Sequence, residues 1–256
     1  MDTKTYNVNL KALKEIAETD LTIDVGYKGE VKSFRRHLRN DLRDAIIITN
    51  DKHEMRYFYS NYNSMTEIPN RIVAAPDLNT CLQLFSNCKQ LTKIDVSELN
   101  TEKVTDYRNM FGFCYKLEEI EGINDLNTTN ATDMTGMFIS SIALKRLDLG
   151  DWNTSNVTKM MQMFSGMGNL EYLNISEWDT SKVTNFNLMF QYCQSLKEIK
   201  GAIDLTSVEQ GNVGMFNTSY RPSDGFVLRV KNAPTWLKAS NMGLKDNQLE
   251  ILSYRG

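Results

Sequence analysis

The residue types that carry most enzyme chemistry are scarce in this chain of 256 residues. Only two histidines occur, His37 and His53, so a Ser/His/Asp or Cys/His mechanism has few candidate bases. The four cysteines include no CxxC pair, which leaves little material for a zinc or haem site. We therefore expect a protein without a catalytic residue, a cofactor or a bound metal.

The chemistry that remains is recognition by charged and aromatic side chains, which recur in two series with a period of about 26 residues. The first series alternates in charge and can neutralise itself, and it contains Lys93, Glu119, Arg146, Tyr172 and Glu198. The second contains Asp95, Glu121, Asp148, Asn174 and Lys200. Its three successive carboxylates repel one another, which a basic protein surface would relieve. Tyr172 is the side chain best suited to anchor a partner, because tyrosine is enriched in binding hot spots.

A second candidate recognition element is a basic segment near the N-terminus. Between residues 31 and 43, five cations stand against one carboxylate, a local charge of +4 in a chain of net charge −3. The cations expected to contact a partner are Lys32, Arg35, Arg36 and Arg39. One interpretation is a solvated helix face, and the other is a patch for phosphate or an acidic protein. Nucleic-acid binding is less favoured, because no aromatic residues are interleaved in the manner of a known module.

These side chains are positioned by a repeat, which is visible as a column of phenylalanines. The spacing along the column is constant except for one extra residue between the second and third members, and the members are Phe85, Phe111, Phe138, Phe164, Phe190 and Phe216. A leucine follows six residues after each of the first five, and Ile or Leu three residues later, a spacing typical of the strand in a leucine-rich repeat. No such coil buries its apolar stripe alone, so we expect a solenoid of stacked coils.

Each coil is also predicted to contain a short helix. Apolar residues stand at −4, −1, 0 and +3 relative to the phenylalanine, the spacing of one helix face. A threonine before this helix is placed to cap it, at Thr105, Thr132, Thr158 and Thr184. The cysteines and most methionines occupy the same apolar positions and are predicted to be core residues, the cysteines as free thiols. Asn or Asp followed by Thr marks a corner, because these side chains can bond the local backbone.

The predicted fold class is α/β, a leucine-rich-repeat solenoid of about six to seven strand-helix coils over residues 55–220, with a degenerate first repeat around Tyr59. Residues 1–54 are expected to form an α+β cap or docking segment, with helices over 8–17 and 30–44 and strands over 21–25 and 45–49. Residues 221–256 are expected to cap the other end as strand 226–231, helix 233–240 and strand 248–254.

Two consecutive repeats carry a family resemblance. The segment from Asp151 reads DWNTSNVTKMMQMFSGMGNLEYLNIS, and it recurs from Glu177 as EWDTSKVTNFNLMFQYCQSL. This pattern resembles the BspA-type leucine-rich repeat of bacterial surface proteins and covers about residues 55 to 220. The resemblance implies a non-enzymatic recognition domain, usually on exported proteins, where it is associated with adhesion.

Three uses of such a domain are consistent with these residues. The first is bacterial or phage host-surface recognition or adhesion. The second is a phage or mobile-element protein that binds and inhibits a host protein or nucleoprotein complex inside the cell, and the third is a virion tail component. The N-terminus has no apolar signal-peptide core and no segment approaches the length of a membrane span, so we expect a bacterial cytoplasmic or virion location, or the surface if a signal was removed. The chain is expected to be a monomer or an oligomer joined through its N-terminal segment.

Overall fold

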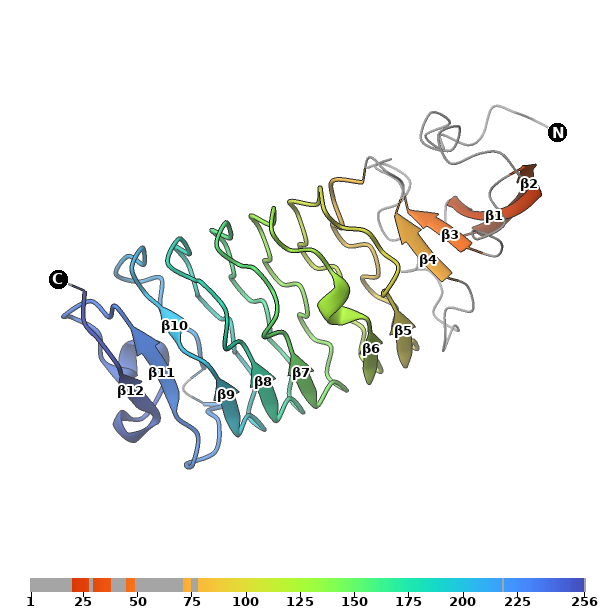
Figure 1. Ribbon diagram of the computed structural model, residues 1–256. Coiled ribbons are helices and arrows are strands. Elements are labelled where there is room, and N and C mark those ends of the chain that lie inside the picture. The colour runs from red at the N-terminus through yellow and green to blue at the C-terminus, as the bar shows by residue number, and fades with distance from the viewer. Residues whose placement is uncertain are drawn as a thin grey trace.

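The computed structural model describes residues 78–217 and 219–255 in full, together with four strands within residues 20–74. The fully described part is a solenoid of about five turns, which confirms the predicted stacking of coils (Figure 1). Each coil crosses the same edge as a short parallel strand: β5 (Lys93–Asp95), β6 (Glu119–Glu121), β7 (Arg146–Asp148), β8 (Tyr172–Asn174) and β9 (Glu198–Lys200). The middle residue of each strand is buried, so its two neighbours face away from the core.

The strand edge is interrupted between β6 and β7. Strands β5 and β6 form one sheet, and β7, β8 and β9 form another. The interruption lies in the coil that holds the one extra residue of the repeat, where a 3₁₀ helix over Ile123–Asp125 follows β6. Gly122 opens this detour with φ +72°, and a Cβ there would lie 2.4 Å from the backbone of Ser97. One inserted residue therefore splits the sheet.

The predicted helix of each coil is wrong, and consecutive turns occupy its place. In the first described coil the Leu84 N–H donates to the Cys81 carbonyl at 3.1 Å, whereas the Phe85 N–H donates to Met110 in the next coil at 2.9 Å. An α-helix keeps its backbone bonds inside one segment, but here alternate N–H groups bond the neighbouring coil. The turns also need left-handed residues. Those residues are Gln83, Asn87, Asn109, Phe113, Gly136, Ser140, Gln162, Gly166, Leu188 and Tyr192.

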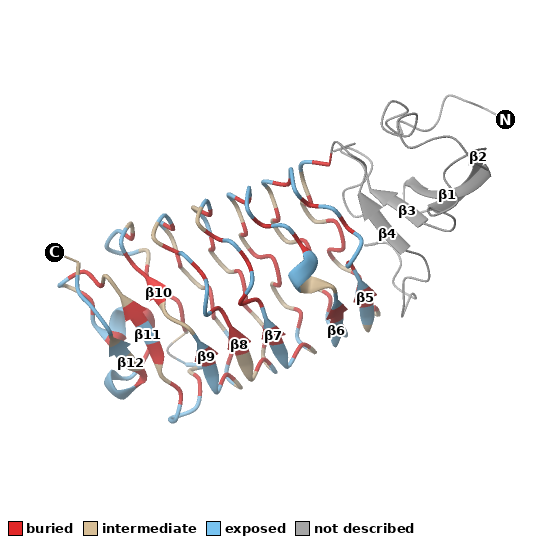
Figure 2. Ribbon diagram, in the orientation of Figure 1, coloured by how far each residue is buried: buried red, intermediate tan, exposed pale blue. Residues whose placement is uncertain are grey.

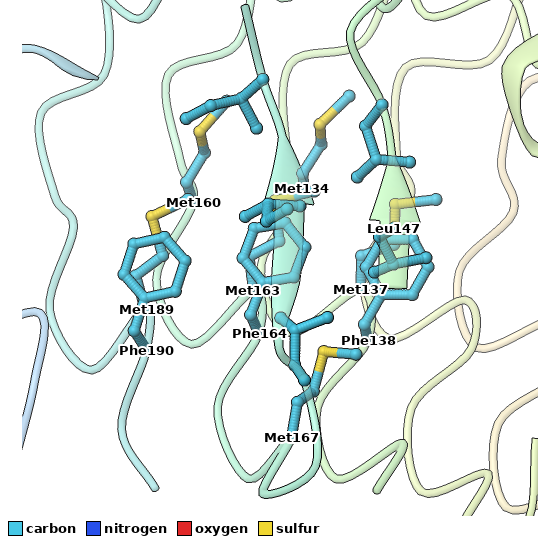
Figure 3. Close-up of a cluster of buried hydrophobic side chains, with 14 of the residues drawn as sticks. Met134, Met137, Phe138, Leu147, Met160, Met163, Phe164, Met167, Met189 and Phe190 are labelled. Atoms are coloured by element: carbon cyan, nitrogen blue, oxygen red, sulfur yellow. The ribbon is translucent and has the colours of Figure 1, made fainter. Parts of the chain in front are cut away.

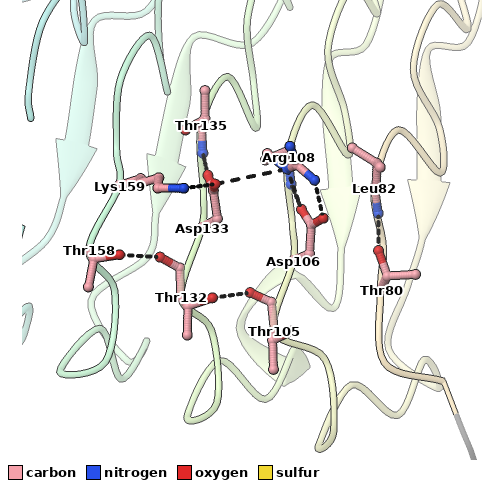
Figure 4. A network of polar contacts seen from close by, with 10 residues as sticks. All are labelled: Thr80, Leu82, Thr105, Asp106, Arg108, Thr132, Asp133, Thr135, Thr158 and Lys159. Carbon is pink, nitrogen blue, oxygen red and sulfur yellow. Dashed lines mark hydrogen bonds and ion pairs between the residues drawn. The ribbon is translucent and has the colours of Figure 1, made fainter.

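The predicted threonine caps are wrong for the same reason, because no helix N-terminus is present for them to cap in the described coils. The Thr132 hydroxyl instead donates to the Thr105 carbonyl at 3.1 Å, and the Thr158 hydroxyl donates to the Thr132 carbonyl at 3.3 Å (Figure 4). The column therefore ties each coil to the one before it. At the Asn-Thr corners the side chain does bond the local backbone as predicted, for example from the Glu102 N–H to Asn100 Oδ1 at 2.9 Å.

The core is a stack of aromatic rings surrounded by methionine and leucine side chains (Figure 3). The six phenylalanines of the repeat lie in a continuous column with neighbouring ring centroids 5.2 to 5.7 Å apart. Trp152 and Trp178 stack beside it at 6.3 Å. Figure 2 shows buried positions in red recurring along every described coil, and these include the apolar positions of the repeat. The predicted core positions are therefore confirmed, although the backbone that buries them is not helical.

The described N-terminal elements are all strands, so the predicted α+β composition is not supported. They are β1 (Asp20–Tyr27), β2 (Glu30–His37), β3 (Ala45–Ile48) and β4 (Arg71–Ala74), in the sheet order β2-β1-β3-β4. The predicted strands over 21–25 and 45–49 are confirmed as β1 and β3. The predicted helix over 30–44 is wrong at least over β2, which pairs antiparallel with β1 along its whole length and satisfies the backbone there. The predicted helix 8–17 and the repeat around Tyr59 lie outside the described residues.

At the C-terminal end, β10 (Ile203–Asp204), β11 (Leu228–Lys231) and β12 (Leu249–Ile251) form a parallel sheet. Strands β11 and β12 confirm the two predicted strands, although both are shorter. The helix predicted over 233–240 is wrong: the Leu237 N–H closes one turn on the Pro234 carbonyl at 3.0 Å, and a 3₁₀ helix begins only at Ala239. A second 3₁₀ helix, Asp246–Gln248, leads into β12.

Candidate protein-recognition face

The outward side chains of β5 to β9 form what we call the strand face. The structure places the two predicted series in register along it, with Lys93 opposite Glu119, Asp95 opposite Glu121, and Arg146 opposite Tyr172. Most of these side chains are exposed, and the buried middle residues hold their strands to the core. The face is therefore a set of side chains in fixed positions on a rigid support, which is the arrangement that surface recognition requires.

At the β5–β6 end of the strand face the charges neutralise one another. Lys93 Nζ lies 3.2 Å from Glu119 Oε1 and 3.1 Å from Glu121 Oε2. Hydrogen bonds to Glu121 and Glu119 raise the pKa of Lys93 above its ordinary value. Asp95 accepts the Ser97 N–H at 2.9 Å, and its hydrogen bonds to Ser97 lower the pKa of the carboxyl. These contacts leave little unbalanced charge for a partner.

The predicted run of three stacked carboxylates does not form continuously. Asp95 and Glu121 are register neighbours, but Asp148 lies beyond the interruption, in the other sheet. Asp148 Oδ1 accepts hydrogen bonds from the Asn174 side chain at 2.7 Å and from the Gly150 N–H at 3.2 Å. Asn174 is itself buried, with 6% exposure, so its amide serves the sheet more than the surface. The inserted residue and these local bonds together weaken the case for a basic partner.

The β7–β9 end of the strand face has a different character. The Arg146 guanidinium carbon lies 4.2 Å from the centre of the Tyr172 ring, a cation–π contact between neighbouring strands. Glu198 and Lys200 follow on β9, both exposed. Among the described residues, no carboxylate oxygen lies within 4.0 Å of the Arg146 guanidinium or of Lys200 Nζ. The structure thus brings Arg146 and Tyr172 together without an ion pair to Arg146 in the described part of the chain. Lys197 chiefly, and Arg146 more weakly, lower the pKa of the nearby Glu171.

A second charged row, which the sequence analysis missed, lies along the edge where single bridges join successive coils. Arg108 binds Asp106 with two bonds, from Nε at 2.9 Å and from Nη2 at 2.7 Å (Figure 4). Asp133 lies 3.9 Å from Arg108 and 3.4 Å from Lys159. The spacing of the repeat relates Asp106, Asp133 and Lys159, so the sequence could have revealed this row. Each cation of the row lies within 4.0 Å of a carboxylate of the row, so the row balances its own charges.

The cations of the basic N-terminal segment do not lie on the helix that the sequence predicts there. Lys32, Arg35 and Arg36 lie on the strand β2, whereas Arg39 lies outside the described residues. A phosphate or acidic-protein patch at these residues stays a prediction.

The described residues offer little support for enzyme chemistry. All four cysteines are buried and free, and burial raises the pKa of Cys193 to about 12, so its thiol stays protonated. Within residues 78–217 and 219–255, no three His, Cys, Asp or Glu side chains are grouped so that they could hold a metal ion. No helix in the described part of the chain is long and apolar enough to cross a bilayer.

Comparison with known proteins places this solenoid in a family. One family model matches residues 79–199 and 116–224, and its description is "Mycoplasma protein of unknown function, DUF285". A leucine-rich repeat protein from Bacteroides ovatus ATCC 8483, solved at 1.19 Å, matches 96% of this chain and 100% of its own at 13% identity, with a TM-score of 0.22, too low to carry an argument. No curated protein matches. The family model matches more than half of the residues of this chain. The chain therefore belongs to the DUF285 family.

Proposed function

We propose that this protein is a non-enzymatic recognition module that binds another protein through its strand face. The observation that carries the proposal is the fixed register of exposed charged and aromatic side chains on β5 to β9, above a core of stacked rings. Such a support loses little conformational entropy on binding, because the strands are already ordered. The partner-contacting residues are proposed to be Asp95, Glu119, Glu121, Arg146, Asp148 and Tyr172, whereas Lys93 and Asn174 bind side chains of the neighbouring strands.

The biological setting that we propose is host-surface recognition or adhesion. The resemblance of the repeats to those of bacterial surface proteins supports this setting. The alternative of an intracellular inhibitor predicts a soluble host protein as partner, whereas surface recognition predicts a partner in the cell-envelope fraction. The two settings therefore differ in the fraction that yields the partner.

The experiment is capture by the purified full chain from a bacterial envelope fraction and, separately, from a soluble lysate, followed by mass spectrometry. A strand-face variant, Glu119→Arg with Glu198→Arg, is compared with an edge variant, Glu102→Arg with Glu209→Arg. All four glutamates are exposed, and the two variants make the same charge change. We expect the wild type and the edge variant to capture one protein equally, and the strand-face variant to capture less of it if the partner is basic and more of it if the partner is acidic. Equal capture by both variants, or no reproducible capture, would contradict the proposal.

A further inference from the structure

Two cations stand at equivalent positions on the strand face, and the structure uses them differently. Lys93 begins β5 and lies within 3.2 Å of both Glu119 and Glu121, so its charge is balanced inside the protein. Arg146 begins β7 and has no such carboxylate among the described residues; its guanidinium lies over the Tyr172 ring instead. The neighbouring carboxylate of Glu171 is bound by Lys197 at 2.7 Å. In the described part of the chain, Arg146 is thus held in place without a carboxylate acceptor for its N–H groups.

A stacked guanidinium is well suited to bind a carboxylate. The cation–π contact with Tyr172 uses no hydrogen-bond acceptor, so the N–H donors of Arg146 stay available for two parallel bonds to a carboxylate. Stacking on Tyr172 also restricts the long Arg146 side chain before binding, so less rotamer entropy is lost in the complex. Lysine presents neither the fork nor the stacking surface, which separates this position from Lys93 in chemistry as well as in charge balance.

A second unbalanced cation lies on the same part of the strand face. Lys200 is exposed, ends β9 and pairs in register with Asn174, two strands from Arg146 on the face. Two strand spacings across and two residues along put the Arg146 and Lys200 backbones about 12 Å apart. Carboxylates three or four residues apart in an extended peptide span a similar distance at about 3.3 Å per residue. Asp148 shares β7 with Arg146 and Glu198 shares β9 with Lys200, so a carboxylate flanks the line between the two cations on each side and disfavours further acidic groups of the peptide there.

We propose that Arg146, stacked on Tyr172, is the anchor by which the strand face binds an acidic segment of a partner protein, with Lys200 as a second contact. This inference rests on the proposed function, because it names the chemistry of the partner for the same face. The inference favours an acidic partner, whereas the series of carboxylates in the sequence, Asp95, Glu121 and Asp148, predicts a basic one.

The test uses fluorescent extended peptides in which two glutamates are separated by one to five Gly or Ser residues, with glutamine versions as neutral controls. Binding is measured by anisotropy at low and at physiological salt for the wild type, Arg146→Gln, Tyr172→Leu and Lys93→Gln. We expect the two- or three-residue spacer to bind best, and Arg146→Gln to weaken it about tenfold or more. Lys93→Gln makes the same charge change at the balanced position and should leave binding within about twofold. Thermal unfolding of each variant checks that the fold is intact.

Equal affinity for the glutamate and glutamine peptides, or equal loss in Arg146→Gln and Lys93→Gln, would overturn the assignment of Arg146. The capture experiment separates this failure from a failure of the proposed function. If the strand-face variant loses an identified partner that Arg146→Gln still binds, only the acidic anchor is wrong. If the wild type captures no partner through this face, the recognition function fails whatever the peptides show.

Discussion

The indole N–H of Trp152 donates to the backbone carbonyl of Ile123 at 2.9 Å, across the point where the strand edge is interrupted. In the next coil Trp178 makes the equivalent bond to Leu149 at 2.7 Å, where the strands are paired. The indole hydrogen bond to the preceding coil therefore forms across the inserted residue although the sheet does not continue there. This bond is one of the links that join β6 and β7 into one solenoid.

Replacing Trp152 by phenylalanine removes that bond while keeping an aromatic ring in the stack. We expect the free energy of unfolding to fall by about 1–3 kcal/mol, because the partly buried Ile123 carbonyl loses its donor and the smaller ring leaves space. Urea denaturation followed by circular dichroism measures the change. An unchanged midpoint would show that the Ile123 carbonyl is satisfied without the indole.

Two threonines in one column make a matched pair. The Thr154 hydroxyl donates to the Asp179 carbonyl at 2.9 Å, whereas the buried Thr128 hydroxyl has no hydrogen-bond partner among the described residues. We expect Thr128→Val to keep or raise stability, since it removes an unsatisfied polar group, and Thr154→Val to lower it by about 1 kcal/mol. Thermal or urea unfolding of both variants checks the difference. A larger loss in Thr128→Val would contradict the assignment.

The turn conformation predicts an unusual response to glycine. Gln162 has φ +58°, and Gly136 occupies the equivalent position one coil earlier with φ +61°. Because a left-handed backbone disfavours a side chain, we expect Gln162→Gly to raise the free energy of unfolding by up to about 1 kcal/mol. In the helix first predicted for this segment, the same change would lower stability by a similar amount. The sign of the change in a urea titration therefore distinguishes the two backbones.

The Asp95 carboxylate predicts a pH-dependent contribution to stability. Hydrogen bonds to Ser97 lower the pKa of Asp95 in the folded protein below the ordinary value of 3.8. The stabilisation is therefore present above about pH 4 and is lost as pH falls through the folded pKa. Comparing wild type with Asp95→Ala between about pH 3 and pH 7, we expect a difference of at most about 1 kcal/mol at neutral pH that shrinks in acid. A difference that grows on acidification would refute this.

The sequence by itself determined the solenoid and the register of its face. The even spacing of the phenylalanines places one ring in each coil, and rings can be buried only by stacking on their neighbours. The leucine pattern set the strand positions, so the pairs Lys93 with Glu119 and Arg146 with Tyr172 followed from counting residues. The corners were also predictable, because an Asn such as Asn100 bonds its own local backbone.

Only the tertiary structure decided whether the segment from four residues before each repeat phenylalanine to three residues after it forms a helix or a series of turns. Both bury the same residues, so hydrophobic spacing could not separate them. The choice depends on bonds such as that from the Phe85 N–H to Met110, which exist only when the coils are stacked. The same holds for charge: Lys93 and Arg146 look alike in sequence, and only packing shows that one is balanced by two glutamates and the other lies on a tyrosine. The repeat sets positions along the chain, whereas contacts between coils decide what each position does.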